Sequence, residues 1–206
     1  MHFLITGALN ISNSSSIINE QRKIEYILCL HKIFNYNLPV HMVLSECNEL
    51  EYKSSYFNMF NYTTTKIIEN TEILGANTKS QKEFLSISEW IKNAPSIDDS
   101  TWIIKLSGRY LLLDDFFITT VKSLDDRYNA VLKIIDNTLG CTFCFAMRWK
   151  YFKDFYSKPI ELLGEKCVEN FIIEYIIENK LTDSTINISN LGILTNIAND
   201  NKYTIY

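Results

Sequence analysis

The sequence predicts an α/β fold, a single Rossmann-like domain in which helices flank a mostly parallel, mixed sheet. Short apolar segments alternate with segments of helical periodicity along most of the chain, as strand–helix–strand units require. The second apolar segment, residues 39–45, is almost uninterrupted, which is typical of a strand covered on both faces. No repeat, linker or low-complexity stretch divides the 206 residues, so we predict one domain over 1–206.

The first half of the chain predicts three strands and two helices. Residues 2–6 form a short apolar run, a polar stretch rich in helix N-cap residues follows, and residues 17–34 then show helical spacing. Together with the strand at 39–45, these segments form a βαβ unit. A third strand is expected at 63–69, where apolar and polar residues alternate, and a second helix at 80–92.

The second half predicts the rest of the sheet and its helices. A short apolar strand at 101–106 is followed by a helix that begins with aspartate, and the later segments alternate in the same way. The expected elements are a helix at 114–124, strands at 129–135 and 142–147, helices at 148–156 and 160–180, and a strand at 185–189. Ligands of such folds bind beyond the carboxyl ends of the strands. Chemistry is therefore expected in the loops at 7–16, 45–48, 74–79 and 107–115.

Composition restricts the partners of the chain. The net charge is -4, with 24 acidic against 20 basic side chains, so the basic surface that nucleic-acid binding needs is not expected. The longest apolar runs reach about half of the ~18 residues that a membrane span needs, and the first residues lack the features of a signal peptide. The odd number of cysteines, five, argues for a reducing compartment. We therefore expect a cytoplasmic protein with no nucleic-acid partner and no membrane span.

The clearest candidate for a ligand loop is Ser107-Gly108-Arg109-Tyr110, which follows the strand at 101–106. A glycine lets the backbone approach a ligand closely, and an arginine can clamp a carboxylate or a diphosphate through two parallel hydrogen bonds. The alternative is a tight turn in which Arg109 has a structural role. Its partner would then be one of the nearby aspartates, Asp98, Asp99, Asp114 or Asp115.

Two further segments carry weaker signals. Gly7-Ala8-Leu9-Asn10 follows the first strand like a nucleotide-binding turn, but it lacks the G-x-G-x-x-G of dinucleotide sites and the G-K-[ST] of phosphate loops. NAD binding of that kind and P-loop hydrolysis are therefore disfavoured. Glu169 lies at the start of the last long helix, where by itself it is explained as a solvated carboxylate that complements the helix dipole.

Six short motifs, taken in order, make the sequence resemble a known family. They are Thr6-Gly7-Ala8-Leu9-Asn10, Gly75-Ala76-Asn77, Lys105-Leu106-Ser107-Gly108-Arg109-Tyr110, Phe145-Ala146-Met147-Arg148, Cys167-Val168-Glu169 and Leu191-Gly192-Ile193. With these motifs the chain is similar to small glycosyltransferases of the A-type fold that occur in large DNA viruses, capsid-glycosylating proteins among them, and in some bacteria. The resemblance covers nearly the whole chain, and the motif that begins at Lys105 is its most specific part.

The resemblance implies a nucleotide-sugar-binding domain that moves a sugar from a nucleoside diphosphate, with uridine as the base, to a hydroxyl of a glycan or glycoprotein acceptor. In such folds the loop after the first strand holds the base and ribose, and the loop after the central strand lies at the diphosphate. The donor-binding residues implied for this chain are Thr6, Gly7, Ala8, Asn10, Asn77, Lys105, Ser107, Gly108 and Arg109. A viral member would act in the cytoplasm of its host.

The sequence departs from the family at the metal site. Members carry an Asp-x-Asp after the central strand that binds a divalent cation, whereas this chain has Ser107-Gly108-Arg109 there and no Asp-x-Asp anywhere. Either Mn²⁺ or Mg²⁺ is weakly held by fewer acidic ligands together with the phosphates, or Lys105 and Arg109 neutralise the diphosphate without a metal.

The resemblance also assigns the acid–base chemistry. Glu169 corresponds to the family's acid near the acceptor cleft, so it is the expected general base of an inverting transfer, while in a retaining reaction it would only bind acceptor hydroxyls. Arg109 is expected to act in catalysis by stabilising the leaving diphosphate. Two other classes stay open: an inactive module of the same fold that binds carbohydrate or protein, and a methyl- or nucleotidyltransferase.

Overall fold

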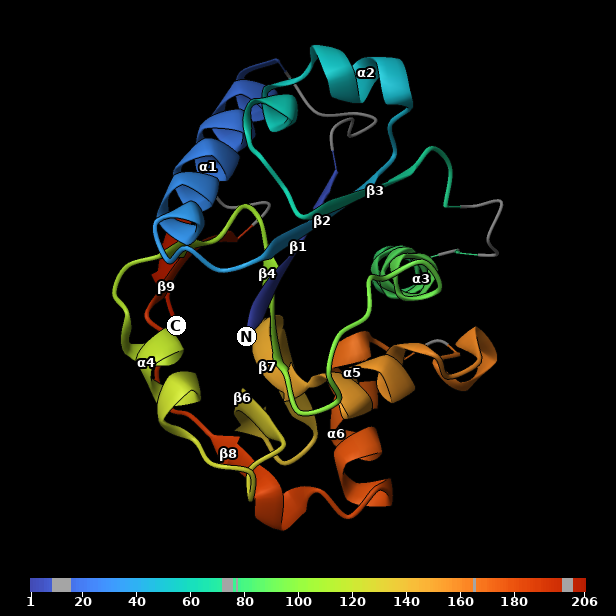
Figure 1. The fold of residues 1–206 in the computed structure, drawn as a ribbon, viewed down its shortest axis with the longest axis vertical. Coiled ribbons are helices and arrows are strands. Elements are labelled where there is room, and N and C mark those ends of the chain that lie inside the picture. Colours follow the sequence, from blue (N-terminus) through green and yellow to red (C-terminus); the bar gives the residue numbers. More distant parts are fainter. Residues whose placement is uncertain (9–15, 72–75, 77, 165, 198–201) are drawn as a thin grey trace.

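The computed structural model describes residues 1–8, 16–71, 76, 78–164, 166–197 and 202–206 of the chain (Figure 1). A seven-stranded sheet runs through the centre of the molecule in the order β3-β2-β1-β4-β7-β6-β8. Its strands are β1 (His2–Ala8), β2 (Val40–Ser45), β3 (Thr64–Ile68), β4 (Trp102–Ser107), β6 (Ala130–Asp136), β7 (Leu139–Arg148) and β8 (Thr185–Asn187). Each of them overlaps a strand that the sequence predicts.

Neighbouring strands of this sheet are parallel except where β7 pairs. β1 is parallel to β2 and β4, β2 is parallel to β3, and β6 is parallel to β8. β7 is antiparallel to both of its neighbours, β4 and β6, because it follows β6 through a short hairpin turn. The predicted mostly parallel, mixed sheet is therefore confirmed.

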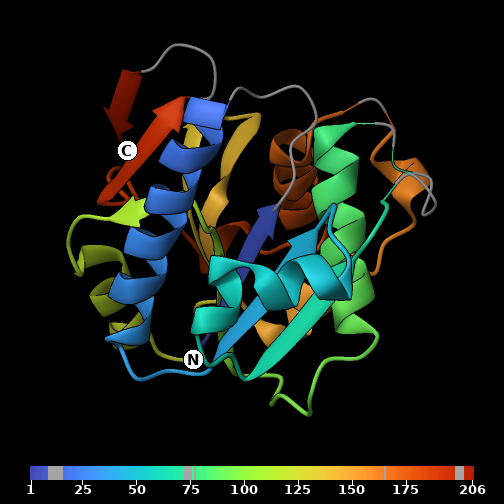
Figure 2. The same ribbon diagram turned by 90° about the horizontal axis from the view of Figure 1, so that it is seen from above.

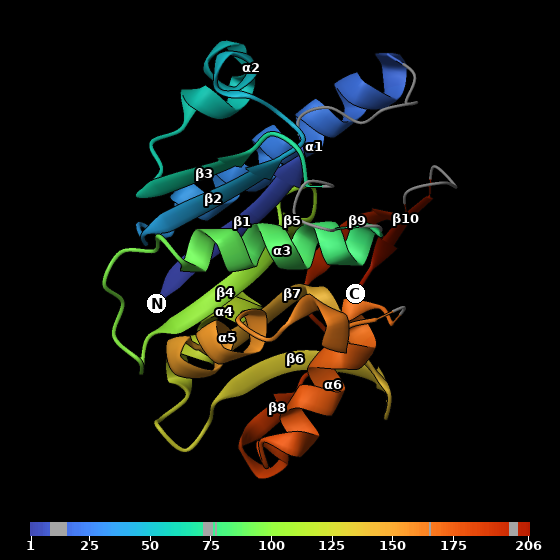
Figure 3. The same ribbon diagram turned by 90° about the vertical axis from the view of Figure 1, so that its right-hand side faces the viewer.

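Helices cover both faces of the sheet. One face carries α3 (Lys79–Ile91), α5 (Trp149–Tyr156) and α6 (Val168–Glu178), and the other carries α1 (Ser16–Phe34) and α4 (Phe116–Ser123) (Figures 1 and 3). A small antiparallel sheet of β5 (Leu111–Leu112), β9 (Ile193–Ile197) and β10 (Lys202–Ile205) lies beside α1 (Figure 2). In the part of the chain that the structure describes, no helix is both long enough and apolar enough to cross a membrane.

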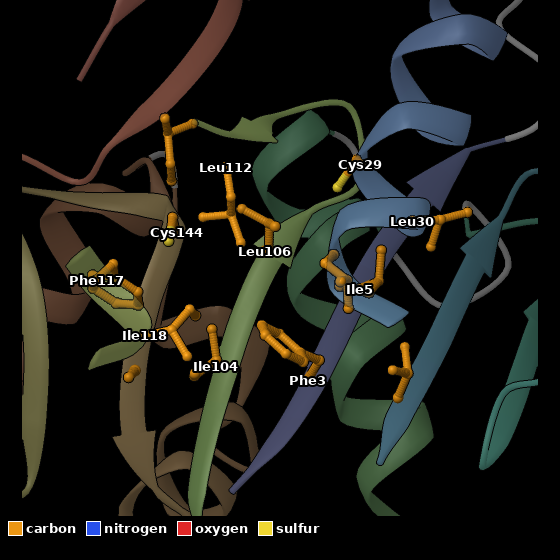
Figure 4. Close-up of a cluster of buried hydrophobic side chains, with 14 of the residues drawn as sticks. Phe3, Ile5, Cys29, Leu30, Ile104, Leu106, Leu112, Phe117, Ile118 and Cys144 are labelled. Atoms are coloured by element: carbon orange, nitrogen blue, oxygen red, sulfur yellow. The ribbon is translucent and has the colours of Figure 1, made fainter. Parts of the chain in front are cut away.

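Each face of the sheet has its own buried core. Phe3, Ile104 and Phe117 belong to the core beneath α1 and α4 (Figure 4). On the opposite face, strand residues pack on aromatic side chains of the helices, such as Phe84 and Phe155. Because both faces are filled by the chain itself, the edge at the carboxyl ends of the parallel strands is where a ligand can approach.

The structure differs from the prediction in three places. The predicted helix at 160–180 is divided, because a 3-10 turn at Ile160–Leu162 ends before Gly164 and α6 begins only at Val168. Gly164 has φ +53°, the left-handed conformation that commonly ends a helical segment. The aperiodic segment at 47–62 contains α2 (Glu49–Ser54) and a 3-10 turn at Tyr56–Met59. The small sheet is the third difference.

Candidate functional site

The strand order of the sheet reverses at β1. β2 and β3 extend the sheet from one side of β1, and β4 extends it from the other. Ligands of such sheets bind at this switch point, beyond the carboxyl ends of the two strands. Thr6 lies opposite Ser107 in the register, and the Gly108 amide donates to the Thr6 carbonyl at 2.9 Å. The ends of β1 and β4, both predicted to bind the donor, are therefore adjacent.

Lys105 lies fully buried near the end of β4, on the face covered by α3 and α6. Its ammonium group forms an ion pair with Glu83 of α3. It also donates to the Thr142 carbonyl at 2.8 Å and to Ser107 Oγ at 3.2 Å. The ammonium group thus has one carboxylate partner and two hydrogen-bond acceptors. Lys105 therefore holds Ser107 in place, and a donor that contacted Lys105 directly would compete with these partners.

Glu169 is linked to the same network through Thr142. The Thr142 hydroxyl donates to Glu169 Oε1 at 2.9 Å, and Glu169 lies half-buried in the first turn of α6. Thr142 belongs to the part of β7, between Gly140 and Phe145, where the pairing with β6 shifts register. An irregularity of this kind redirects side chains. Lys105, Ser107 and Glu169, which the resemblance implied separately, thus share one network of polar contacts.

Two members of this network, Glu83 and Thr142, were not predicted as site residues from the sequence. Their signals are weak, because a glutamate in an amphipathic helix and a threonine in an apolar strand are both common without any function. Two residues that the resemblance implied as donor-binding, Asn10 and Asn77, lie outside the residues that the structure describes. The network of polar contacts described above therefore does not include them.

Tyr26 of α1 packs against the two glycines of the switch point on the opposite face of the sheet. A Cβ atom added to Gly108 would lie 2.8 Å from Tyr26 Cε1, and one added to Gly7 would lie 3.2 Å from the same atom. The Tyr26 hydroxyl accepts a hydrogen bond from the Ala8 amide at 3.1 Å. The sequence predicts that glycine admits a ligand in this loop, but the group that approaches Gly108 in the structure is the Tyr26 ring.

Arg109 contacts α1 on the same face. Its Nε donates to Glu25 Oε2 at 3.2 Å, and the exposed fractions of the two side chains are only 13% and 9%. The alternative prediction, in which Arg109 pairs with one of the nearby aspartates for structural reasons, is therefore wrong about the partner. One of those aspartates, Asp115, instead accepts from Lys32 of α1 at 3.0 Å.

The residues at this edge do not fit a metal held by the protein alone. Ser107, Gly108 and Arg109 supply no carboxylate, and within the described ranges no three His, Cys, Asp or Glu side chains gather as metal ligands. Mn²⁺ and Mg²⁺ need several oxygen ligands, mostly carboxylates and phosphates. Glu83, an acid of the network, is paired with Lys105. A divalent cation at this edge would therefore depend on phosphate oxygens that a ligand brings.

No protein-family model and no curated protein matches the sequence. Several solved structures share the fold. The galactosyltransferase LgtC, in complex with donor and acceptor sugar analogs, has a TM-score of 0.51 and 9% identity, covering 91% of this chain and 73% of its own. For mouse xyloside xylosyltransferase 1 the values are 0.51 and 8%, with 91% and 84% covered. For a cytidylyltransferase from Leptospira borgpetersenii they are 0.52 and 13%, with 92% and 75% covered.

These likenesses concern the fold and not the activity. At such low identity a shared fold does not carry residue roles from one chain to another. The A-type fold of nucleotide-diphospho-sugar transferases, which the resemblance implied, is confirmed for this chain. The comparisons do not bear on a viral source.

Proposed function

We propose that the chain is a glycosyltransferase that moves a sugar from a uridine diphosphate donor to a hydroxyl of a glycan or glycoprotein. The observation that supports this proposal is the meeting of the ends of β1 and β4 at the switch point of an A-type fold, through the hydrogen bond from Gly108 to Thr6. Both strand ends were expected at the donor on sequence grounds. The proposed setting is the cytoplasm, where free thiols such as those of Cys29 and Cys144 stay reduced.

In this proposal the donor lies along the switch point. Thr6, Gly7, Ala8 and Asn10 are assigned to the base and ribose, and Ser107 and Gly108 are assigned to the diphosphate. Asn77 is assigned to the donor without a more specific role. Arg109 binds the diphosphate with its guanidinium, which makes bidentate contacts with phosphate oxygens. Lys105 acts indirectly, because its hydrogen bond to Ser107 Oγ orients that hydroxyl.

The chemistry follows from the position of Glu169. The acceptor oxygen attacks the anomeric carbon, the bond from that carbon to the diphosphate breaks, and the bonding electron pair stays on the phosphate oxygen. In an inverting reaction Glu169 takes the proton of the acceptor hydroxyl. In a retaining reaction Glu169 binds an acceptor hydroxyl instead, and the proton of the attacking hydroxyl passes to the leaving phosphate oxygen. In both cases the leaving diphosphate gains negative charge, and Arg109 stabilises it.

A thermal-shift panel of nucleoside diphosphates and their sugars, with and without Mn²⁺, tests the donor assignment. A ligand at 100 times its dissociation constant stabilises the folded state by about 2.7 kcal/mol. We expect stabilisation by uridine diphosphate and by one of its sugars, followed by sugar transfer to a glycan acceptor. A panel in which no nucleoside diphosphate raises the melting temperature would overturn the proposal.

A nucleotidyltransferase is the second candidate, because a cytidylyltransferase shares the fold with a TM-score of 0.52. The two activities release different products. A nucleotidyltransferase would join a nucleoside triphosphate to a sugar phosphate and release pyrophosphate. A glycosyltransferase releases a nucleoside diphosphate. The missing Asp-x-Asp also favours a further alternative, an inactive module that binds carbohydrate or protein. Binding of the donor without turnover toward any glycan would identify that module.

A further inference from the structure

Arg22 adds a second guanidinium to the contact between Arg109 and α1. It lies on α1 one turn before Glu25, the carboxylate that Arg109 contacts. Arg22 and Arg109 are close enough for the charge of Arg109 to lower the pKa of Arg22, although burial of Arg22 lowers that pKa more. The carboxylate of Glu25 therefore pairs with Arg109 and lies within electrostatic range of Arg22.

One donor of the Arg22 guanidinium is not satisfied by the described residues around it. Its Nε is buried and has no hydrogen-bond partner among the described residues. The segment at 9–15, which precedes α1, contains no acidic residue in the sequence. Leaving a buried donor unpaired costs about 1–3 kcal/mol, and more for a charged group. A second positive charge nearby adds repulsion. A buried donor without a partner on a partly buried cation calls for an explanation, and a bound anion supplies one.

Tyr26 ties this pair of arginines to the switch point. It lies next to Glu25 in the chain and one turn after Arg22. Its hydroxyl accepts the Ala8 amide at 3.1 Å, and its ring packs against Gly108. The positive charges thus lie beside the carboxyl ends of β1 and β4, where ligands of such folds bind. On the other face of the sheet, Lys105 is paired with Glu83 and donates hydrogen bonds to Thr142 and Ser107.

We propose that Arg22 and Arg109 form a two-arginine site for the diphosphate of the donor, in the role that an Asp-x-Asp and its metal have elsewhere in this fold. This inference rests on the proposed function and adds Arg22 to the site. The planar guanidinium of each arginine can make two parallel hydrogen bonds to phosphate oxygens. Glu25 holds Arg109 in position, and the excess positive charge stabilises the diphosphate as it leaves.

Binding of inorganic pyrophosphate, uridine diphosphate and uridine to wild type, Arg22→Met and Arg22→Gln tests the site by calorimetry. Methionine keeps an unbranched, apolar side chain and removes the guanidinium, while glutamine keeps hydrogen-bonding capacity without charge. We expect both variants to bind pyrophosphate and uridine diphosphate at least tenfold more weakly, with the affinity for uridine unchanged. Their melting temperatures should not fall, because a buried donor without a partner is removed. Arg127→Gln, which removes an exposed arginine paired with Asp125, should bind all three ligands like wild type.

The outcomes separate this inference from the proposed function. Arg22-dependent binding of pyrophosphate without any sugar transfer would support the site and count against the glycosyltransferase. If the wild type transfers sugar and both Arg22 variants bind the diphosphate as tightly as wild type, the two-arginine site alone is overturned. An equal loss of affinity for uridine and uridine diphosphate, or a wild type that binds neither pyrophosphate nor uridine diphosphate, would also overturn it.

Discussion

A single hydroxyl holds the carboxylate to which we assign the acid–base chemistry. Thr142 donates to Glu169 Oε1 at 2.9 Å and has its own carbonyl bonded to Lys105. Thr142→Val keeps the shape of the side chain and removes this bond. A hydrogen bond to a charged group contributes about 1.5–3 kcal/mol, so we expect turnover to fall about tenfold to hundredfold with little change in the KM of the donor. Steady-state kinetics with a uridine diphosphate sugar measures both constants.

Thr142→Ser is the matched control, because serine restores the hydroxyl. It should recover most of the lost turnover if the hydrogen bond orients Glu169. Equal losses in the valine and serine variants would contradict the positioning role and point to packing of the threonine methyl group.

The two glycines of the switch point predict a graded loss of stability. An added Cβ at Gly108 would lie 2.8 Å from both Ile5 and Tyr26, whereas at Gly7 its shortest contact is 3.2 Å. Contacts under about 3.0 Å force neighbouring atoms to move, and overpacking costs about 1–3 kcal/mol. We expect Gly108→Ala to lower the free energy of unfolding by that amount and Gly7→Ala by less. Urea denaturation of both variants measures the order, and an equally stable Gly108→Ala protein would rule this packing out.

At the residue scale, the sequence indicated which residues are unusual but not which groups they contact in the fold. The glycines and Arg109 stand out in the sequence, and the structure gives each a defined environment. Their partners could not be predicted, because Glu25 is 84 residues from Arg109 and Tyr26 is 18 residues from Ala8. Only the packing of α1 on the ends of β1 and β4 brings these groups together. Residue types and local spacing do not carry that information.

At the scale of elements, periodicity predicted what hydrophobic burial determines locally. All seven strands of the main sheet were predicted. Strands such as β2 and β4 carry buried apolar runs, and β3 shows alternation. The small sheet was missed because β5 has only the two residues Leu111–Leu112 and pairs with β9, which is distant in the sequence at Ile193–Ile197. α2 was missed because it contains no buried residue, although its capping box of Asn48 and Glu51 is a sequence signal of a helix start.

A chain of buried polar groups links three neighbouring strands to α3 and makes stability depend on pH. His41 of β2 is fully buried and contacts His2 of β1 at 3.0 Å and Thr64 of β3 at 2.8 Å. Trp90 of α3 donates to the same Thr64 hydroxyl at 3.1 Å. Burial, and to a smaller extent the charge of His2, lowers the pKa of His41 to about 4. The folded protein therefore resists protonation that the unfolded chain accepts near pH 6.5.

The sign of the effect follows from that difference. The stability that neutral His41 provides is complete above about pH 6.5 and is lost as the pH falls toward 4, by about 1.4 kcal/mol per pH unit. We expect the free energy of unfolding to fall over this range in wild type, and to fall less steeply in His41→Gln. Urea denaturation at several pH values measures both slopes. His31→Gln, at an exposed position of α1, should keep the wild-type slope, and identical slopes in all three proteins would contradict the role of His41.

At the scale of the whole molecule, the fold class was predictable and the site only in part. Alternating strands and helices admit few topologies, and ligands of such sheets bind at the switch point. The sequence therefore indicated the edge of the sheet at which the ends of β1 and β4 meet. It could not show that the polar groups divide between two faces, with Lys105 and Glu169 on one and Arg109 on the other. That division follows from which helix packs on which face.

The lack of a carboxylate in Ser107, Gly108 and Arg109 leads to a last prediction, which concerns metal. Within the described residues no cluster of three possible ligands exists, and a hard cation needs several oxygen ligands. Mn²⁺ titrated into the protein without nucleotide should therefore give no saturable heat in calorimetry, whereas Mn²⁺ added with uridine diphosphate can bind through the phosphates. If Arg22 and Arg109 neutralise the leaving diphosphate, sugar transfer should also persist in excess chelator, and Arg22→Met should lose more activity in chelator than in Mn²⁺, because a phosphate-bound cation can replace the missing charge. Tight binding of Mn²⁺ by the nucleotide-free protein would contradict the charge arrangement on which the two-arginine site depends.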